Sequence, residues 1–204
     1  MKFKFPGLLV VGFVAGSMTV HASVIDFEAL ASAGSGWTTV FPPFTEDGYQ
    51  LSASNGNFTS AQSGNIAWYA GSTGLFNNYL GATTTLSSTA GVPFDLVSID
   101  LARLSTERAS GAAVTFVGGQ TGGGSASQTF TVGDALAFQS FSFSSDFRDL
   151  LFVTWMQTVP EHQFDNININ VSAVPIPSTA WLFGTTLAGL GLARKHKQRK
   201  MLSA

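Results

Sequence analysis

The sequence predicts an all-β fold, a two-sheet β-sandwich, for the central part of the chain, residues 23–173. Two observations lead to this prediction. No long segment of the region shows the 3.6-residue apolar period of an amphipathic helix, and Ser, Thr, Gly, Asn and Phe dominate its composition. About eight short strand-like segments follow one another with turn signals between them, a spacing typical of sandwiches and barrels.

Two of these segments alternate apolar and polar side chains, as strands with one buried face do. In the first, residues 97–101, the apolar positions begin with Val97 and continue at Ile99 and Leu101. The second, residues 164–171, is expected to turn its isoleucines and Val171 inward and its asparagines outward.

Other segments predict a hairpin and a fully buried strand. Residues 114–117 and 128–132 should pair around a long glycine-rich loop. Residues 150–156 are continuously apolar, which predicts a central strand covered on both faces. The remaining strands are expected at residues 24–28, 48–53 and 141–143.

The N-terminal residues 1–22 have the pattern of a signal peptide. Lys2 and Lys4 give it a basic start, and residues 8–15 are an apolar stretch interrupted by one glycine. Small residues at Val20 and Ala22 place the expected cleavage before Ser23. The alternative is an uncleaved N-terminal anchor, for which the apolar stretch is short.

The C-terminal residues 174–204 combine a proline-rich box, an apolar span and a basic end. The box is Val174-Pro175-Ile176-Pro177-Ser178, and its two prolines break regular structure. Trp181 suits a membrane interface, and residues 182–193 are apolar. Basic residues that start with Arg194 and Lys195 follow the span and should stay cytoplasmic, which leaves the central region outside.

This arrangement resembles the PEP-CTERM sorting signal of Gram-negative bacteria, in a Pro-x-Pro variant. The resemblance implies a transient membrane anchor through the C-terminal transmembrane helix, recognition and cleavage by an exosortase, and release to the cell surface or extracellular matrix. It further implies an association with exopolysaccharide and biofilm. Ile176 stands where the name-giving glutamate usually sits, which leaves the class of exosortase open. An ordinary tail anchor is the alternative.

The charge of the central region differs from that of the whole chain. Two of the ten Lys and Arg residues lie in residues 1–22 and five in residues 174–204, which leaves three. All twelve Asp and Glu residues lie in the central region, so its net charge is −9, against −2 for the whole chain. Such a charge repels phosphates, so no nucleic-acid partner is expected. The chain has no cysteine, which excludes disulfides and thiolate metal sites.

The acidic residues include three candidate ligands for a cation. Asp26 and Glu28 are expected on one face of the first strand, and Asp165 should face inward with Ile167. A buried carboxylate needs a partner or a cation. Solvated acids at strand ends are the alternative interpretation.

The strand-like segments at residues 94–101 and 164–167, together with Gly118-Gly119, resemble secreted jelly-roll domains of the carbohydrate-binding type. The resemblance implies a jelly roll. It also implies a structural calcium ion shared by an acid of the N-terminal strand and a C-terminal aspartate. Here these would be Glu28 and Asp165, with Asp26 as a helper. Oxygen ligands of this kind suit calcium.

Four aromatic residues outside the expected core strands could stack on sugar rings, and they lie in segments rich in Gly, Ser and Asn. They are Trp37, Trp68, Tyr69 and Tyr79. Trp155, in contrast, belongs to a predicted core strand. For each of the four, a place in the core is the alternative, since the chain's eighteen phenylalanines show that aromatic side chains are core material here.

The sequence supports catalysis only weakly. His162 is the single histidine of the central region and is expected in a solvated loop, and there is no Gly-x-Ser-x-Gly motif to supply a nucleophile. We therefore expect a non-enzymatic surface or matrix protein that is associated with polysaccharide and binds glycans. The alternatives are a purely structural matrix protein without a specific ligand, and a glycoside hydrolase that uses a pair of carboxylates.

Overall fold

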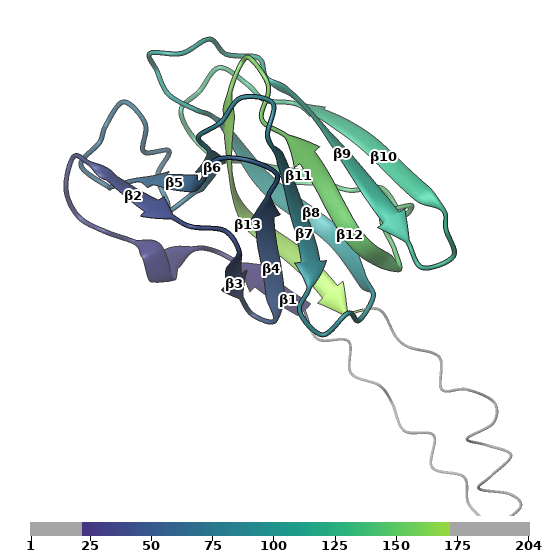
Figure 1. Cartoon of the computed structure of the whole chain (residues 1–204). Helices are drawn as coiled ribbons and strands as arrows, with labels where there is room; N and C mark the ends of the chain where they lie inside the picture. Colours follow the sequence, from purple (N-terminus) through teal and green to yellow (C-terminus); the bar gives the residue numbers. More distant parts are fainter. Residues whose placement is uncertain (1–21, 172–204) are drawn as a thin grey trace, which may run out of the picture. The chain divides into compact units, whose positions relative to one another are not determined.

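The computed structural model of the chain describes residues 22–171, which are almost entirely β-strands and loops (Figure 1). Within these residues no helix is long and apolar enough to span a membrane. The predicted signal peptide, up to His21, and the predicted sorting segment, residues 174–204, lie outside the described residues.

The strands are short, and every strand pair in the described part of the chain is antiparallel. Their bounds are β1 Ala22–Ile25, β2 Trp37–Val40, β3 Phe44–Glu46, β4 Tyr49–Ala53, β5 Phe58–Ala61, β6 Phe76–Asn77, β7 Thr83–Ser88, β8 Phe94–Arg103, β9 Ala113–Gln120, β10 Ser125–Thr131, β11 Gln139–Ser142, β12 Leu150–Met156 and β13 His162–Val171. One 3₁₀ helix, η1, covers Glu28–Leu30.

The strands form two facing layers and a small third sheet. One layer has the order β1-β13-β8-β11, and the other has the order β3-β4-β7-β12-β9-β10. A single residue pair, Leu150 opposite Phe94, joins the layers into one hydrogen-bonded network. Strands β2, β5 and β6 form a separate sheet to one side of the layers (Figure 1). The predicted all-β sandwich is confirmed.

The core lies between the layers, and Phe164 of β13 connects its parts. The Phe164 ring is fully buried and lies 5.0 Å from the Trp155 ring of β12 in the facing layer, measured between centroids. It also lies 5.9 Å from the Phe27 ring, which follows β1, and 6.2 Å from the Phe58 ring of the small sheet. One aromatic core therefore holds both layers, the N-terminal segment and the small sheet together.

The predicted alternation of buried and exposed side chains is confirmed at some positions of β13 and β8 and wrong at others. In β13, Ile167 and Ile169 are buried as predicted, whereas Val171, at the strand's end, is 37% exposed. In β8, Ile99 is buried but Val97 is 41% exposed, against the prediction. Val97 is an extra residue at a shift in the β8–β13 register, and a bulge of this kind moves the following side chains to the other face.

The strand β12 is central, as predicted, because it pairs with β7 on one side and with β9 on the other. The prediction that both of its faces are covered is wrong. Val153 and Trp155 face the core, but Phe152 and Met156 are 41% and 47% exposed. A continuous apolar run can therefore also mark a strand whose outer face stays in contact with solvent.

The first strand is shorter than predicted. It ends at Ile25, and Phe27 has a left-handed φ of 54°, which a strand cannot continue through. This conformation directs the Phe27 side chain into the core, where it is 0% exposed. Asp26 and Glu28 consequently lie in the turn and in η1, and the prediction that they share a strand face is wrong.

The predicted hairpin is confirmed as β9–β10, with a shorter loop than expected. Gly118 and Gly119 belong to β9, where they pair with Ala126 and Ser125. The remaining glycines form the tight turn, in which Gln120 donates its N–H to Gly124 O at 2.9 Å.

The placement of His162 contradicts the predicted solvated loop. It is the first residue of β13 and is 0% exposed. Neither ring nitrogen has a hydrogen-bond partner among the described residues. Burial disfavours the charged ring and lowers the pKa of His162 to about 4.

We expect His162 to make the domain less stable as the pH falls. Because its folded pKa is about 4 and its ordinary value is 6.5, the unfolded chain binds a proton that the folded chain does not. Above pH 6.5 the ring is neutral in both states and His162 does not lower the free energy of unfolding. As the pH falls from 6.5 toward 4, the free energy of unfolding decreases by up to roughly 3 kcal/mol. His162→Gln should remove this part of the pH dependence, measured by urea denaturation. If the free energy of unfolding changes equally with pH in the variant and the wild type between pH 6.5 and pH 4, the prediction is contradicted.

Candidate functional site

A hollow of about 380 Å³ lies between the small sheet and the loops that follow β8 and β12. Trp37 of β2 and Phe76 of β6 line it from the small sheet. Trp68 enters from the loop between β5 and β6, Arg108 from the loop after β8, and Glu161 from the loop before β13. The lining thus combines three aromatic rings with one pair of opposite charges.

The three rings of this hollow form a contiguous aromatic cluster. Trp37 and Trp68, both predicted to stack on sugars, lie 4.8 Å apart between centroids at an interplanar angle of 82°. Phe76 lies 5.8 Å from Trp37 and 6.3 Å from Trp68. Trp37 remains 42% exposed, although ring contacts on this scale are typical of a core. The structure therefore brings together two of the predicted aromatic residues and leaves apolar ring surface at the solvent boundary.

Hydrogen bonds from the sandwich hold Trp68 in place. The buried side chain of Gln163 donates from Nε2 to Trp68 O at 3.0 Å and to Arg103 O at 2.9 Å. In addition, Thr106 donates its main-chain N–H to Ala67 O at 2.9 Å. The main chain of the loop that carries Trp68 is thereby fixed to β13 and to the segment that follows β8.

Arg108 lies over the Trp68 ring, with its Cζ 5.8 Å from the centroid. Its guanidinium also pairs with Glu161 at 3.5 Å, and the Arg108 side chain is 53% exposed, against 13% for Glu161. An ion pair with this exposure contributes little to stability. Its effect is local: it neutralises Glu161 and places an arginine on one face of Trp68.

The other two predicted aromatic residues do not line this hollow. Tyr79 is 52% exposed on the segment after β6, and Tyr69 is half-buried beside Trp68 in sequence. Neither has a ring contact with the Trp37–Trp68–Phe76 cluster.

Two of the three predicted cation ligands, Asp165 and Glu28, accept hydrogen bonds from the consecutive residues Ser72 and Thr73. The Asp165 carboxylate is fully buried and accepts a hydrogen bond from Ser72 Oγ. The Glu28 carboxylate accepts hydrogen bonds from Thr73 N at 3.1 Å and from Thr73 Oγ1 at 3.2 Å. None of these donors is charged, so neither carboxylate gains a positive partner here.

The pKa of Asp165 is raised to about 7, mainly by burial and also by the nearby carboxylates of Asp100 and Glu28, while the hydrogen bonds from Ser72 and Asn166 oppose the shift. An inward-facing Asp165 was predicted and is confirmed.

Asp26 lies apart from this pair. It contacts Glu46, whose pKa is raised mainly by burial and also by the charge of Asp26. Within residues 22–171, no three Asp, Glu or His side chains gather as a metal-binding group. A cation at Asp165 and Glu28 would therefore take its other oxygen ligands from neutral groups or water.

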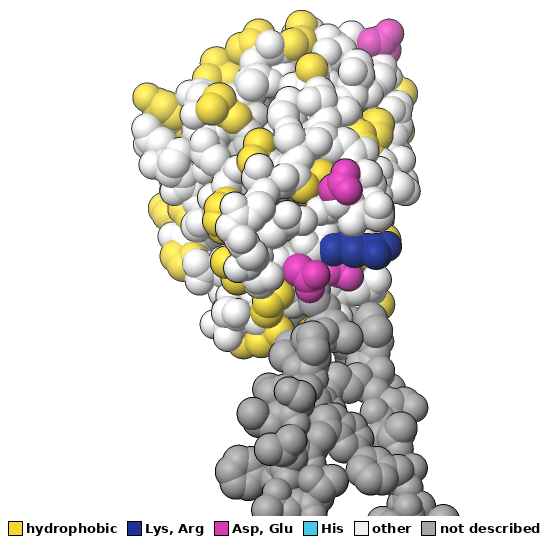
Figure 2. Space-filling model, turned by 90° about the vertical axis from the view of Figure 1, so that its right-hand side faces the viewer, with side chains coloured by type: hydrophobic (Ala, Val, Ile, Leu, Met, Phe, Trp, Pro, Cys, Tyr) yellow, Lys and Arg dark blue, Asp and Glu magenta, His cyan; other side chains and the backbone are white. Residues whose placement is uncertain are grey.

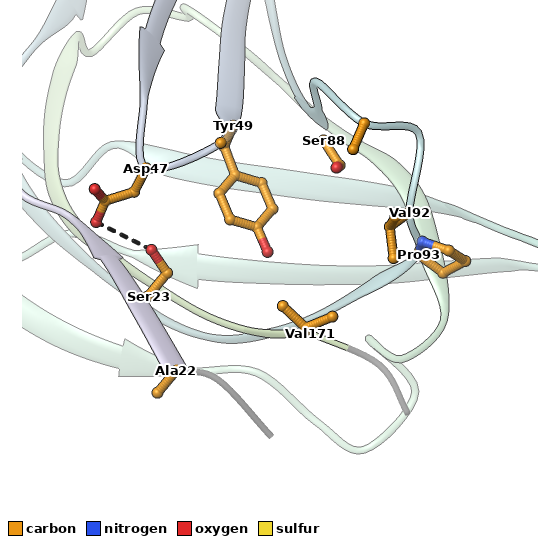
Figure 3. A pocket seen from close by; sticks show the side chains of 10 residues that line it. Ala22, Ser23, Asp47, Tyr49, Ser88, Val92, Pro93 and Val171 are labelled. Atoms are coloured by element: carbon orange, nitrogen blue, oxygen red, sulfur yellow. Dashed lines mark hydrogen bonds between the residues drawn. The ribbon is translucent and has the colours of Figure 1, made fainter. Parts of the chain in front are cut away.

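A second hollow, of about 480 Å³, lies at the end of the sandwich where β1 begins and β13 ends. Tyr49 turns its ring into it, Val171 and Val92 line it, and Ser23 Oγ donates to Asp47 at 3.1 Å beside it (Figure 3). It offers one aromatic ring and few polar groups, so we regard the hollow of the aromatic cluster as the candidate site.

Sequence reasoning missed Phe76, Arg108 and Glu161 as members of the site. Arg108 carried a usable signal, because it is one of three cations in a strongly acidic region. Phe76 carried none, since its segment looks like many other phenylalanine-containing segments of the chain.

No protein-family model matches this chain, and no curated protein matches it. Among solved structures, a mutant of CBM29-2, a family 29 carbohydrate-binding module complexed with mannohexaose, is similar at 9% identity. The match covers 75% of this chain and 93% of that one, with a TM-score of 0.43. The CBM22-1 xylan-binding domain from Paenibacillus barcinonensis Xyn10C is similar at 15% identity, over 78% of this chain and 100% of that one, with a TM-score of 0.42. Likenesses of this size identify no ligand and no site residue in this chain.

Proposed function

We propose that the β-sandwich is a non-enzymatic glycan-binding domain, and that the hollow lined by Trp37, Trp68 and Phe76 holds a short segment of uncharged polysaccharide. The observation that carries the proposal is the meeting of Trp37 and Trp68, from separate elements, in the lining of one hollow. Sugar rings present C–H faces that pack on aromatic rings.

The polar lining of the hollow suits a ligand rich in hydroxyl groups. Thr39 and Thr59 line it from the small sheet, and Asn78 lines it from the segment after β6. Asn78 is exposed and accepts from Asn57 N through Oδ1, while its NH₂ group has no partner among the described residues. The volume of about 380 Å³ is at the low end for small-molecule sites, so it takes a short part of a chain.

The charges favour a neutral glycan over an acidic one. Arg108 is the cation of the hollow, and Glu161 already neutralises it. The surrounding domain carries a net charge of −9, counted over residues 23–173. A polymer of uronic acids would meet repulsion from the domain without gaining a free positive partner in the site.

We expect Trp37→Ala and Trp68→Ala each to weaken binding to neutral polysaccharides at least about tenfold, since a loss of about 1.4 kcal/mol has that effect. Affinity electrophoresis or calorimetry on a panel of neutral and acidic polysaccharides measures this. The matched control is Ile66→Ala, which removes an 87% exposed side chain from the same loop as Trp68 but lies outside the hollow.

Unchanged binding in both tryptophan variants would exclude this site. Absence of binding to any polysaccharide would favour the purely structural matrix protein. Turnover of a glycan that depends on one carboxylate would favour the hydrolase.

We also propose a structural calcium ion between Glu28 and Asp165. The support is the fully buried carboxylate of Asp165, which lies close to Asp100 and Glu28 and accepts hydrogen bonds from neutral groups alone. Both carboxylates supply the hard oxygen atoms that calcium prefers. The ion would neutralise charge that burial otherwise makes unfavourable.

Without a cation, the raised pKa of Asp165 makes the fold lose stability as the pH rises from 3.8 through about 7. We therefore expect calcium to raise the melting temperature at pH 8, and a chelator to lower it by several degrees. Asp165→Asn should abolish the response, whereas Asp134→Asn, at an exposed acid elsewhere, should keep it. If neither calcium nor chelator changes the melting temperature, the proposed calcium site is refuted.

For the chain as a whole, we propose export, a transient membrane anchor and exosortase processing, which place the domain at the cell surface or in the extracellular matrix. The support is the agreement in orientation between the two chain ends described from the sequence. Mass spectrometry of the protein from cells and medium should find an N-terminus at Ser23 and a C-terminus near the Pro175-Ile176-Pro177 box. A full-length C-terminus in all fractions would favour the ordinary tail anchor.

A further inference from the structure

Five neighbouring strands of the sandwich contain no charged residue. They are β4, β7, β12, β9 and β10, which lie side by side in one layer. All charged side chains of the described residues lie in β3, β8, β13, η1 or the loops. This distribution is unusual in a region whose net charge is −9, because surface charge normally spreads over all outward faces.

The layer ends in an unprotected edge strand, β10. Within the described residues β10 pairs with β9 alone, and Figure 1 shows it at the margin of the molecule. Its seven residues, Ser125–Thr131, include no proline and no lysine, and its register with β9 has no bulge. Natural edge strands usually carry such features because they block pairing with other chains. Figure 2, which views the molecule from this side, shows charged side chains at a few separate places.

The hydrogen-bond pattern shows which main-chain groups of β10 face outward. Gln120 N donates to Gly124 O, and at the other end of the hairpin Val132 N donates to Ala112 O. Since bonded pairs alternate along an antiparallel ladder, the residues of β10 that bond to β9 are Ala126, Gln128 and Phe130. The intervening residues direct their N–H and C=O groups to the free edge, and their side chains are exposed: Ser125, Ser127, Thr129 and Thr131.

We propose that two copies of this chain associate by antiparallel pairing of their β10 strands, around a two-fold axis at Gln128. In this register Ser127 lies opposite Thr129 of the second copy, and Ser125 opposite Thr131. All outward main-chain groups of β10 then find partners, and the five uncharged strands of each copy continue across the interface. Gln128 does not obstruct this contact, because its side chain points inward to Ser142 O and Ser144 N.

The partner that pairs with the free edge of β10 is a second copy of this chain, because the strand edge is complementary to itself under two-fold rotation. The charge distribution supports the same conclusion. Although two domains of charge −9 repel each other, β10 and its four uncharged neighbours bring no charged strand side chains together when two β10 edges pair. One strand pair buries less than the roughly 1,200 Å² of a stable interface, so the association is weak and reversible.

Single-cysteine variants of the full chain test the proposal, because the natural sequence has no cysteine. Ser127→Cys and Thr129→Cys, mixed in equal amounts under mild oxidation, should give a disulfide-linked dimer several-fold more readily than either variant alone. Paired residues in this register are close enough for a disulfide. The matched control is Thr45→Cys, an exposed position on β3, the opposite edge of the same layer.

A second variant tests the association without a cross-link. Thr129→Lys places one added charge on each side of the axis and should abolish the dimer in analytical ultracentrifugation, whereas Thr45→Lys, the same substitution at the exposed position on β3, should not. Melting curves verify that both variants fold. A wild type that stays monomeric at the highest soluble concentration would overturn the proposal. The proposal would also be overturned if the Ser127→Cys and Thr129→Cys mixture cross-linked no more readily than Thr45→Cys. The same holds if the two variants formed disulfides with a different protein and not with each other.

Discussion

Three consecutive residues of β13 determine how the other parts of the domain are placed. Phe164 joins the rings of both layers, the N-terminal segment and the small sheet in one core. The buried side chain of its neighbour Gln163 donates a hydrogen bond to Trp68 O, and Asp165 accepts a hydrogen bond from Ser72 Oγ. Because β13 lies between β1 and β8, these contacts start from a strand held on both sides. The candidate glycan and calcium sites both depend on this strand.

The fold class and most strands could be predicted from alternation and turn residues, since these patterns reflect local geometry. The errors arise where the backbone leaves that geometry. The left-handed conformation of Phe27 ends β1 early, and the bulge at Val97 changes the phase of β8. His162 was assigned to a loop from its polar neighbours, but tertiary packing buries it at the start of β13. Neither a bulge nor a buried histidine leaves a local pattern in a single sequence.

The candidate site could be predicted in part, because aromatic side chains in polar segments are recognisable by composition alone. Composition does not show which of them meet. Trp37 and Trp68 come together because the small sheet and a tethered loop face each other, while Tyr69 and Tyr79 stay outside. Likewise, the partnership of Arg108 with Glu161 depends on loops that are distant in sequence. Contacts between distant segments carry most of the information about this site.

The course of β13 also determines how the domain would carry a mechanical load. A tethered C-terminus and a polysaccharide held at Trp68 would apply force to the two ends of this strand, since Gln163 is at one end and Val171 at the other. Such a force acts along the strand, parallel to its ladders with β8 and β1. All hydrogen bonds of these ladders would then resist together in shear. Pulling the two chain ends apart would instead open the β1–β13 pair from Ala22 and Asn170 onward, one bond after another. If the proposed glycan site and C-terminal attachment hold, β13 would therefore be loaded in shear along its length and not opened from one end.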